Sequence, residues 1–167
     1  FLFRLSRVHI PILPDWKTVI NTKQNDERLT MNEFRINKVK SMDEYFSYRK
    51  LRVYQQAKEL VIYVYGLLLL FPKEEQYALC DQLRRAVISI PSNIAEGMGR
   101  ASVKEQVHFI EIAFGSLNEV MCQLELACDL SYISEENLRT SEDFVKELTR
   151  MLSNLRKIRI ERLKATV

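Results

Sequence analysis

The sequence is poor in the residues that make turns, with four glycines and four prolines among 167 residues. A chain with so few turn-forming residues is expected to fold into a few long helices rather than many short strands. Its apolar runs are shorter than the roughly 20 residues that a membrane-spanning helix needs, so we expect no membrane partner. Hydrophobic residues make up 47% of the chain and charged residues 28%, which indicates one globular domain.

Cysteine and histidine are also scarce, which leaves little material for a metal or redox site. Cys80, Cys122 and Cys128 follow no metal-binding spacing and are predicted to be buried free thiols in a reducing cytoplasm. Glu105 and His108 have the Glu-x-x-His spacing of di-iron bundles, but the second such motif that this site requires is missing. Because the sequence also lacks a nucleophile–base set and a phosphate-binding glycine loop, we expect no cofactor and no enzymatic activity.

Apolar residues recur at steps of three and four in four successive segments, as in helices that bury one face. The four seams are Val53, Ala57, Leu60, Val64, Leu67 and Phe71; Leu79, Leu83, Ala86 or Val87, Ile90 and Ile94; Gln106, Ile110, Ala113, Leu117, Val120, Leu124 and Ala127; and Leu138, Ser141, Val145, Leu148, Leu152 and Leu155. Short links between such helices predict an all-α, antiparallel up-down-up-down four-helix bundle.

We assign this bundle to residues 47–160, between a leader of residues 1–46 and a basic C-terminal tail of residues 161–167. The leader has a short apolar start interrupted by arginines and prolines, and it lacks the pattern of a secretory signal. We expect it to be poorly ordered. The alternative is an amphipathic arm that docks on the bundle or on a partner.

Local signals mark the end of the second helix and the start of the third. Pro91 removes a backbone donor inside the second helix, and the polar residues that follow it are expected to satisfy nearby backbone groups. Gly97 and Gly99 are expected to close that helix in left-handed geometry. Ser102 and Glu105 have the spacing of a capping box, which predicts that the third helix begins there.

Basic residues are the candidate binding groups. The first group is Arg84, Arg85, Arg100 and Lys104, and the second is Arg156, Lys157 and Arg159, continued by Arg162 and Lys164. As nucleic-acid ligands they would contact phosphates, which fix position without reading base sequence. The alternative is structural: the two adjacent arginines pair with Asp81, Glu96 or an acid on a neighbouring helix, and the second group complements the negative end of a helix.

Several motifs of the chain occur together in one known family. They are Gln82-x-x-Arg85-Ala86, Ser89-Ile90-Pro91-x-Asn93-Ile94-Ala95-Glu96-Gly97 with Arg100 after it, Ala113-x-Gly115-Ser116-Leu117-x-Glu119, Tyr54-x-x-Ala57, and Phe71-Pro72-x-Glu74-Glu75. From about Phe46 to Ile158 the chain resembles the bacterial four-helix-bundle family of proteins encoded in 23S ribosomal RNA intervening sequences. It departs from the family at Tyr54, where a tryptophan is favoured.

The resemblance implies an antiparallel bundle that assembles into a ring-like homopentamer. It also implies relatedness to the accessory variability proteins of diversity-generating retroelements, which bind nucleic acid and a reverse transcriptase. We therefore expect a cytoplasmic, non-enzymatic, oligomeric adaptor that binds structured RNA or DNA through phosphate contacts. The alternative is a protein–protein scaffold, for example a reverse-transcriptase accessory, without a direct nucleic-acid role. The strongly apolar first helix agrees with self-association, because a monomer seldom exposes so broad an apolar surface.

Overall fold

The computed structural model describes residues 45–165, so most of the predicted leader lies outside the described residues. Within this range there are four α-helices and no strand, which confirms the predicted all-α fold class. The helices are α3 (Arg52–Leu67), α4 (Leu79–Gly99), α5 (Val103–Asp129) and α6 (Glu135–Ala165), with short 3₁₀ helices at Ser47–Lys50, Leu68–Leu70 and Lys73–Tyr77. Because α6 continues to Ala165, residues 161–165 of the predicted tail extend the last helix.

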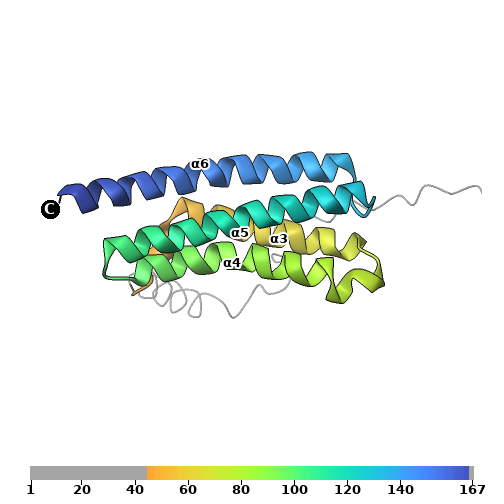
Figure 1. Cartoon of the computed structure of the whole chain (residues 1–167), viewed down its shortest axis with the longest axis horizontal. Helices are drawn as coiled ribbons and strands as arrows, with labels where there is room; N and C mark the ends of the chain where they lie inside the picture. Colours follow the sequence, from red (N-terminus) through yellow and green to blue (C-terminus); the bar gives the residue numbers. More distant parts are fainter. Residues whose placement is uncertain (1–44, 166–167) are drawn as a thin grey trace, which may run out of the picture. The chain divides into compact units, whose positions relative to one another are not determined.

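The helices lie side by side and alternate in direction along the chain (Figure 1). At one end, the Tyr63 hydroxyl late in α3 donates to the carbonyl of Asn137, early in α6, over 3.0 Å. At the other end, Arg156 late in α6 pairs with Glu111, early in α5, at 3.2 Å. Each helix packs against the next one in the chain, and α6 returns to α3. This is the bundle that the sequence predicts.

The predicted seams form the core. Leu60, Leu83, Leu117 and Leu148, one from each helix, are fully buried. Each such side chain stabilises the fold by about 1.5–3 kcal/mol relative to an exposed one. Seam positions near helix ends, such as Phe71, Leu79 and Gln106, are only half-buried, and Leu155 within α6 is half-buried too.

Helix α4 passes through Pro91 without ending. Proline has no N–H to donate to the preceding turn, so the polar side chains that follow it are needed to donate hydrogen bonds to nearby carbonyls. The Ser92 hydroxyl donates to the carbonyl of Ile88 over 2.9 Å, and the Asn93 amide donates to the carbonyl of Ser89 over 2.7 Å. These bonds confirm the prediction that side chains satisfy backbone groups around the proline.

Helix α4 ends at Gly99 as predicted, but the left-handed geometry expected of its glycines is wrong. No glycine among the described residues has a positive φ, so neither Gly97 nor Gly99 adopts left-handed geometry. Gly97 is instead buried against α5, and a Cβ placed there would lie 2.9 Å from the Cβ of Phe109. The absence of a side chain at Gly97 therefore allows α4 and α5 to approach each other closely.

The third helix begins where the predicted capping box places it, with Ser102 at the N-cap, but the capping hydrogen bonds are not formed. Ser102 is the residue before α5, but its side chain makes no capping hydrogen bond. The Gln106 amide instead donates to the carbonyl of Arg100 over 2.7 Å and ties the first turn of α5 to the preceding loop. At the start of α6, the hydroxyl of Ser134 does cap the helix, because it accepts from the Asn137 N–H over 3.2 Å.

Helix α5 ends in a Schellman motif built on a serine. Ser131 has a φ of 61°, which is left-handed geometry. Its N–H donates to the carbonyl of Cys128, and the Tyr132 N–H donates to the carbonyl of Ala127, both over 2.8 Å. Glycine usually occupies this position because a Cβ is unfavourable there. The sequence therefore carries no obvious signal for this turn.

Candidate nucleic-acid interface

Charge is distributed unevenly along the bundle axis. The antiparallel order brings the start of α3, the end of α4, the start of α5 and the end of α6 together (Figure 1). This half, residues 45–59, 90–116 and 150–165, contains twelve lysines and arginines and five carboxylates, and we call it the basic end. The other half, residues 60–89 and 117–149, contains five lysines and arginines and eleven carboxylates, and we call it the acidic end. The formal charges are therefore +7 and −6.

The basic end contains five of the seven predicted ligands, namely Arg100, Lys104, Arg156, Lys157 and Arg159. Arg84 and Arg85 lie at the acidic end instead. Sixteen positions separate Arg84 from Arg100, which corresponds to about 24 Å along α4. The structure thus splits the first predicted group and joins two of its members to the second.

Arg84 and Arg85 both make contacts within their own part of the chain. The Arg84 guanidinium donates to the carbonyl of Gln76 over 3.3 Å. Arg85 pairs with Asp81 one turn earlier in α4, at 2.8 Å, which is the structural alternative predicted for this arginine. Both partners of this pair are largely exposed, so it contributes little to stability.

Two arginines of the basic end have carboxylate partners. Arg100 pairs with Glu96, and its guanidinium lies 4.9 Å from the centre of the Phe109 ring, a cation–π contact. Arg156 pairs with Glu111 across α5 and α6 at 3.2 Å. These two side chains therefore help to hold the end of the bundle together.

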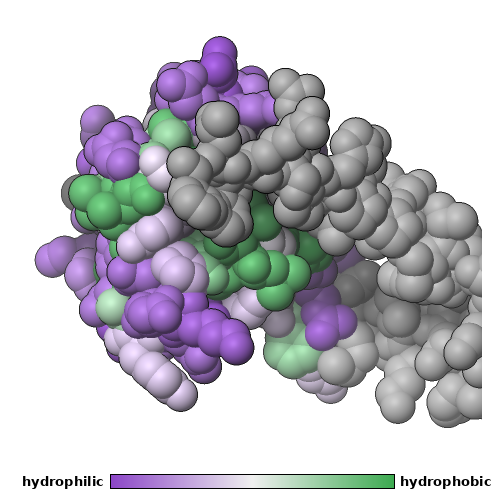
Figure 2. Space-filling view, turned by 90° about the vertical axis from the view of Figure 1, so that its right-hand side faces the viewer, coloured by the Kyte–Doolittle hydropathy of each residue, from purple (hydrophilic) through white to green (hydrophobic). Residues whose placement is uncertain are grey.

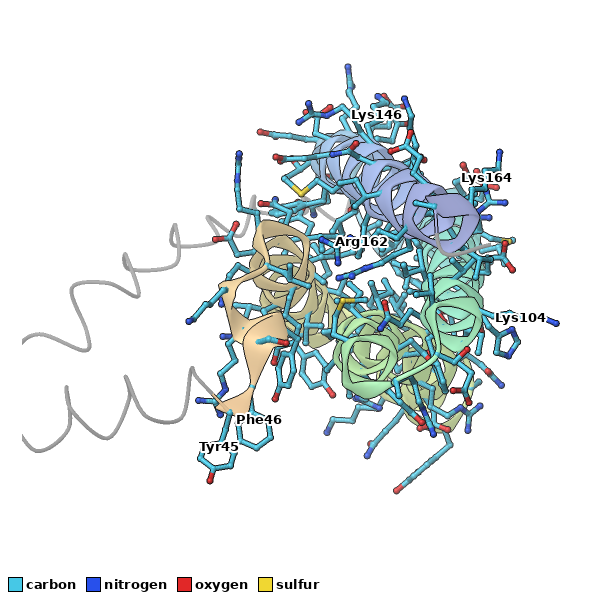
Figure 3. The ribbon with its side chains drawn as sticks, turned by 90° about the vertical axis from the view of Figure 1, so that its left-hand side faces the viewer. Tyr45, Phe46, Lys104, Lys146, Arg162 and Lys164 are labelled. Atoms are coloured by element: carbon cyan, nitrogen blue, oxygen red, sulfur yellow. The ribbon has the colours of Figure 1, made fainter. Side chains whose placement is uncertain are left out.

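The lysines of the basic end are more available. Lys104, Lys157 and Lys164 are exposed, and they make no ion pair within residues 45–165. Figure 3 shows Lys104 and Lys164 pointing outward into solvent from α5 and α6. Exposed ammonium groups of this kind can meet phosphates without first breaking an internal contact.

Arg159 has an unusual environment. Its Nη2 lies 3.2 Å from the sulfur of Met98, and its Nε is enclosed without a hydrogen-bond partner in the described part of the chain. Burial lowers the pKa of Arg159, and the charge of Arg162 lowers it further. Arginine nevertheless stays protonated at neutral pH, so this guanidinium is a partly desolvated positive charge.

Sequence reasoning missed other cations at the basic end. They are Arg49, Lys50, Arg52 and Lys58 near the start of the first helix, and Arg150 in α6. They are far from the predicted groups along the chain, and the antiparallel order of the helices brings them to the same half of the bundle. Summing charge by half-helix, after the bundle had been predicted, would have found them.

An apolar surface lies on the outer side of α3 and α4. Ile62 is 59% exposed and Ile88 43%, although both are aliphatic. A groove of about 350 Å³ runs between the two helices, lined by Tyr54, Lys58, Val61, Ile62, Ile88, Pro91, Ser92 and Ala95. At the acidic end, Leu69 and Leu130 are also exposed, by 82% and 53%. Figure 2, which views this end, shows hydrophobic residues among hydrophilic ones.

The cysteines and histidine show no shared site. Cys80 is buried as predicted, but Cys122 is exposed and Cys128 half-buried, so the prediction of three buried thiols is wrong. Burial raises the pKa of the Cys80 thiol. Among residues 45–165, no three His, Cys, Asp or Glu side chains are grouped as metal ligands, and none of the helices is long and apolar enough to cross a membrane. His108 is exposed beside Phe109.

These features define a small helical-bundle protein with one basic end. Comparison with protein families shows that residues 49–154 match the family described as 23S rRNA-intervening sequence protein. The chain belongs to this family, which confirms the resemblance seen in the sequence.

A solved structure with a similar fold is described as a protein with unknown function from the S23 ribosomal protein family of Bacteroides thetaiotaomicron VPI-5482. The two chains are 23% identical with a TM-score of 0.59, and the alignment covers 63% of this chain and 98% of that one. At this identity the similarity concerns the fold alone. None of the curated proteins compared with the chain matches it.

Proposed function

We propose that this protein is a non-enzymatic, self-associating adaptor that binds structured RNA or DNA through phosphate contacts at its basic end. The observation that carries the proposal is the separation of charge along the bundle, +7 in one half and −6 in the other. A surface with such an excess of cations attracts polyanions and supplies phosphate contacts that do not depend on base sequence.

The cations of the basic end differ in their expected contributions. Lys104, Lys157 and Lys164 are the principal phosphate contacts, because they are exposed and make no ion pair in the described residues. Arg100 and Arg156 contribute less, since each would share its guanidinium with a carboxylate. We assign Arg84 and Arg85 a structural role, because they lie at the acidic end and contact Gln76 and Asp81.

Charge reversal at the two ends tests this proposal. The test variant is Lys104→Glu/Lys157→Glu/Lys164→Glu, and the control Lys73→Glu/Arg85→Glu/Arg139→Glu changes the net charge equally at the acidic end. Binding of a labelled DNA duplex and an RNA hairpin is measured by fluorescence anisotropy between 50 and 300 mM KCl. Each lost contact reduces the slope of log affinity against log salt by about 0.9 for duplex DNA, so the test variant loses about 2.7.

The control variant is expected to keep most of the wild-type affinity and slope. Absence of binding by the wild-type protein at 50 mM KCl would remove the proposal. Equal losses in the test and control variants would also contradict it, because they would show that net charge matters and the basic end does not.

The apolar surface of α3 and α4 supports the self-association part of the proposal and also favours a second function, a protein–protein scaffold. Ile62 and Ile88 lie on the two sides of the groove between these helices. Since monomers seldom leave such a surface in water, we propose that it joins copies of the chain, in a homopentamer as the family resemblance implies.

Sedimentation of an Ile62→Ser/Ile88→Ser variant tests this surface, with Leu126→Ser, which alters an exposed leucine on α5, as the control. We expect the double variant to dissociate and the control to remain assembled. A wild-type protein that sediments as a monomer would contradict self-association. Loss of nucleic-acid binding only in the dissociated variant would link assembly to binding, whereas an assembled protein without nucleic-acid affinity would favour the scaffold.

A further inference from the structure

A second groove lies at the basic end, between the start of α3 and the C-terminal half of α6. Its volume is about 440 Å³, which falls within the range of about 300–1,000 Å³ usual for sites of small organic ligands. It shares no lining residue with the groove between α3 and α4. Contacts between copies of the chain through the α3–α4 groove therefore do not use the residues of this second groove, which we call the α3–α6 groove.

The floor of the α3–α6 groove is apolar. It consists of Val53, which is buried, Leu51, Met151 and Leu155, which are half-buried, and Ile158, which is 40% exposed. The three α6 residues of this floor recur at steps of four and three, so they lie on one face of the helix. Such a floor offers nothing to a small ion, but it favours a ligand group that has a large apolar surface.

The sides of the α3–α6 groove carry positive charge. Arg52 on α3 and Arg150 on α6 line it from opposite helices, and both side chains are exposed. Neither arginine forms an ion pair within residues 45–165, and no acidic residue in this range lines the groove. Glu147 is the nearest acidic position on α6, and it does not pair with Arg150. The two guanidinium groups can therefore bind anionic groups of a ligand that lies between them.

One uncharged polar side chain completes the lining. Asn154 follows Arg150 by one turn on the same edge of α6, and its side chain is exposed. Its amide offers both donors and an acceptor. Nucleobases present donors and acceptors at their edges and apolar surface on their two faces. The groove thus combines an apolar floor, an amide and a cation on each side, which are the groups that a nucleotide requires.

We propose that the α3–α6 groove binds one unpaired nucleotide of the RNA or DNA ligand. The base lies on the apolar floor with its edge at Asn154, and Arg52 and Arg150 bind the phosphates on its two sides. A base inside a regular duplex cannot enter the groove, because its faces are covered by its stacked neighbours. The inference rests on the proposed function and deepens it, since it names the ligand as structured nucleic acid with an unpaired base.

Three RNA duplexes of one sequence test this inference. One has a single unpaired nucleotide, the second has an abasic residue at that position, and the third is fully paired. The first two carry the same number of phosphates, so they differ only in the base. Binding to the full chain is measured by fluorescence anisotropy over the same salt range as before. We expect the wild type to bind the first duplex about tenfold more tightly than the other two, in the lower part of the range for a stacked base.

Substitutions separate the groove from the rest of the basic end. Ile158→Ser removes part of the apolar floor and should reduce the tenfold preference to about threefold or less. Arg52→Gln should weaken binding of the duplex with the unpaired nucleotide about fivefold and change the fully paired duplex much less. Lys157→Gln is the matched control, because it removes a charge of the basic end that does not line the groove. We expect it to weaken binding of all three duplexes equally.

Thiol labelling shows directly what occupies the groove. In an Ile158→Cys variant, position 158 carries a thiol in the groove, and the exposed Cys122 of the acidic end is an internal reference. In dilute protein alone, we expect a maleimide to label both thiols at rates within about an order of magnitude. The duplex with the unpaired nucleotide, at a concentration tenfold above its Kd, should slow labelling of position 158 about tenfold and leave Cys122 unaffected. The abasic duplex at the same concentration should protect position 158 much less.

Other occupants of the groove would give different results and would overturn the inference. A thiol at position 158 that is labelled only at low protein concentration would show that a second copy of the chain covers the groove. Protection at every protein concentration would assign the groove to another segment of the same chain. Equal binding of the three duplexes would remove the nucleotide site and leave the adaptor function standing. Absence of binding to any nucleic acid would remove both.

Discussion

The contact between Gly97 and α5 makes the sharpest prediction about stability. Replacing Gly97 with alanine places a Cβ 2.9 Å from the Cβ of Phe109 and 3.4 Å from the carbonyl oxygen of Gln106. Both atoms belong to or adjoin the α5 backbone, so no flexible side chain can move aside and the helices must separate. Overpacking of this kind destabilises the fold by about 2–3 kcal/mol. The better helix propensity of alanine offsets about 0.5–1 kcal/mol of this loss.

Gly115 provides a matched control in the neighbouring helix. A Cβ at Gly115 has nothing within 4 Å, so Gly115→Ala changes propensity without adding a contact. We expect Gly97→Ala to lower the free energy of unfolding by about 1–2 kcal/mol and Gly115→Ala to raise it by about 0.5–1 kcal/mol. The two variants should then differ in Tm by roughly 6–9 °C.

The assay is urea unfolding followed by far-ultraviolet circular dichroism, with thermal unfolding as a second measure. Protein concentration is held constant, because self-association would make the Tm depend on it. Phe109→Gly removes the clashing Cβ, so the cost of Gly97→Ala should fall by about 1–2 kcal/mol in that background. Equal stability of Gly97→Ala and Gly115→Ala would refute the reasoning that the missing side chain at Gly97 permits the close approach.

Three further predictions concern single residues. Ser131→Gly should stabilise the protein by about 0.5–1 kcal/mol, because Ser131 has left-handed geometry, and a lower urea midpoint would contradict this. Burial raises the pKa of the Tyr63 hydroxyl above 10, the ordinary tyrosine value. The stability that the protonated hydroxyl contributes is therefore complete below pH 10 and is lost as the pH rises through the folded pKa. In unfolding measurements at pH 9–11, Tyr63→Phe should reduce that loss. Cys122 should react with a maleimide in seconds to minutes and Cys80 far more slowly, because Cys122 is exposed and Cys80 is buried with a raised pKa. The two rates are measured by mass spectrometry. Equal rates would be inconsistent with the packing of α4.

Much of the fold was predictable because the decisive information is local. The spacing of Leu60, Leu83, Leu117 and Leu148 within their segments identifies four buried faces without knowledge of their partners. The errors arise where the role of a residue depends on a contact with another helix or on an uncommon turn. Gly97 has the position of a helix terminator in sequence, but its role depends on Phe109, and this contact is visible only after α4 and α5 are packed.

The candidate site was less predictable for the same reason. Arg84 and Arg100 belong to one short stretch of sequence, yet a helix carries them about 24 Å apart. Arg52 and Arg156 are separated by most of the bundle sequence, yet the antiparallel order of α3 and α6 places them in the same half. Charge clusters that span several helices follow from topology, so sequence spacing alone could not assemble the basic end.

Within residues 45–165, the opposite charges of the two halves give the bundle an electric dipole along its long axis. In the field of a polyanion this dipole would turn the bundle before contact, which would favour productive encounters at low ionic strength. The same dipole opposes a ring whose members all point the same way, because neighbouring dipoles aligned side by side repel each other. Added salt screens that repulsion. A parallel ring would therefore become more stable as the salt concentration rises, whereas its affinity for a charged ligand would fall.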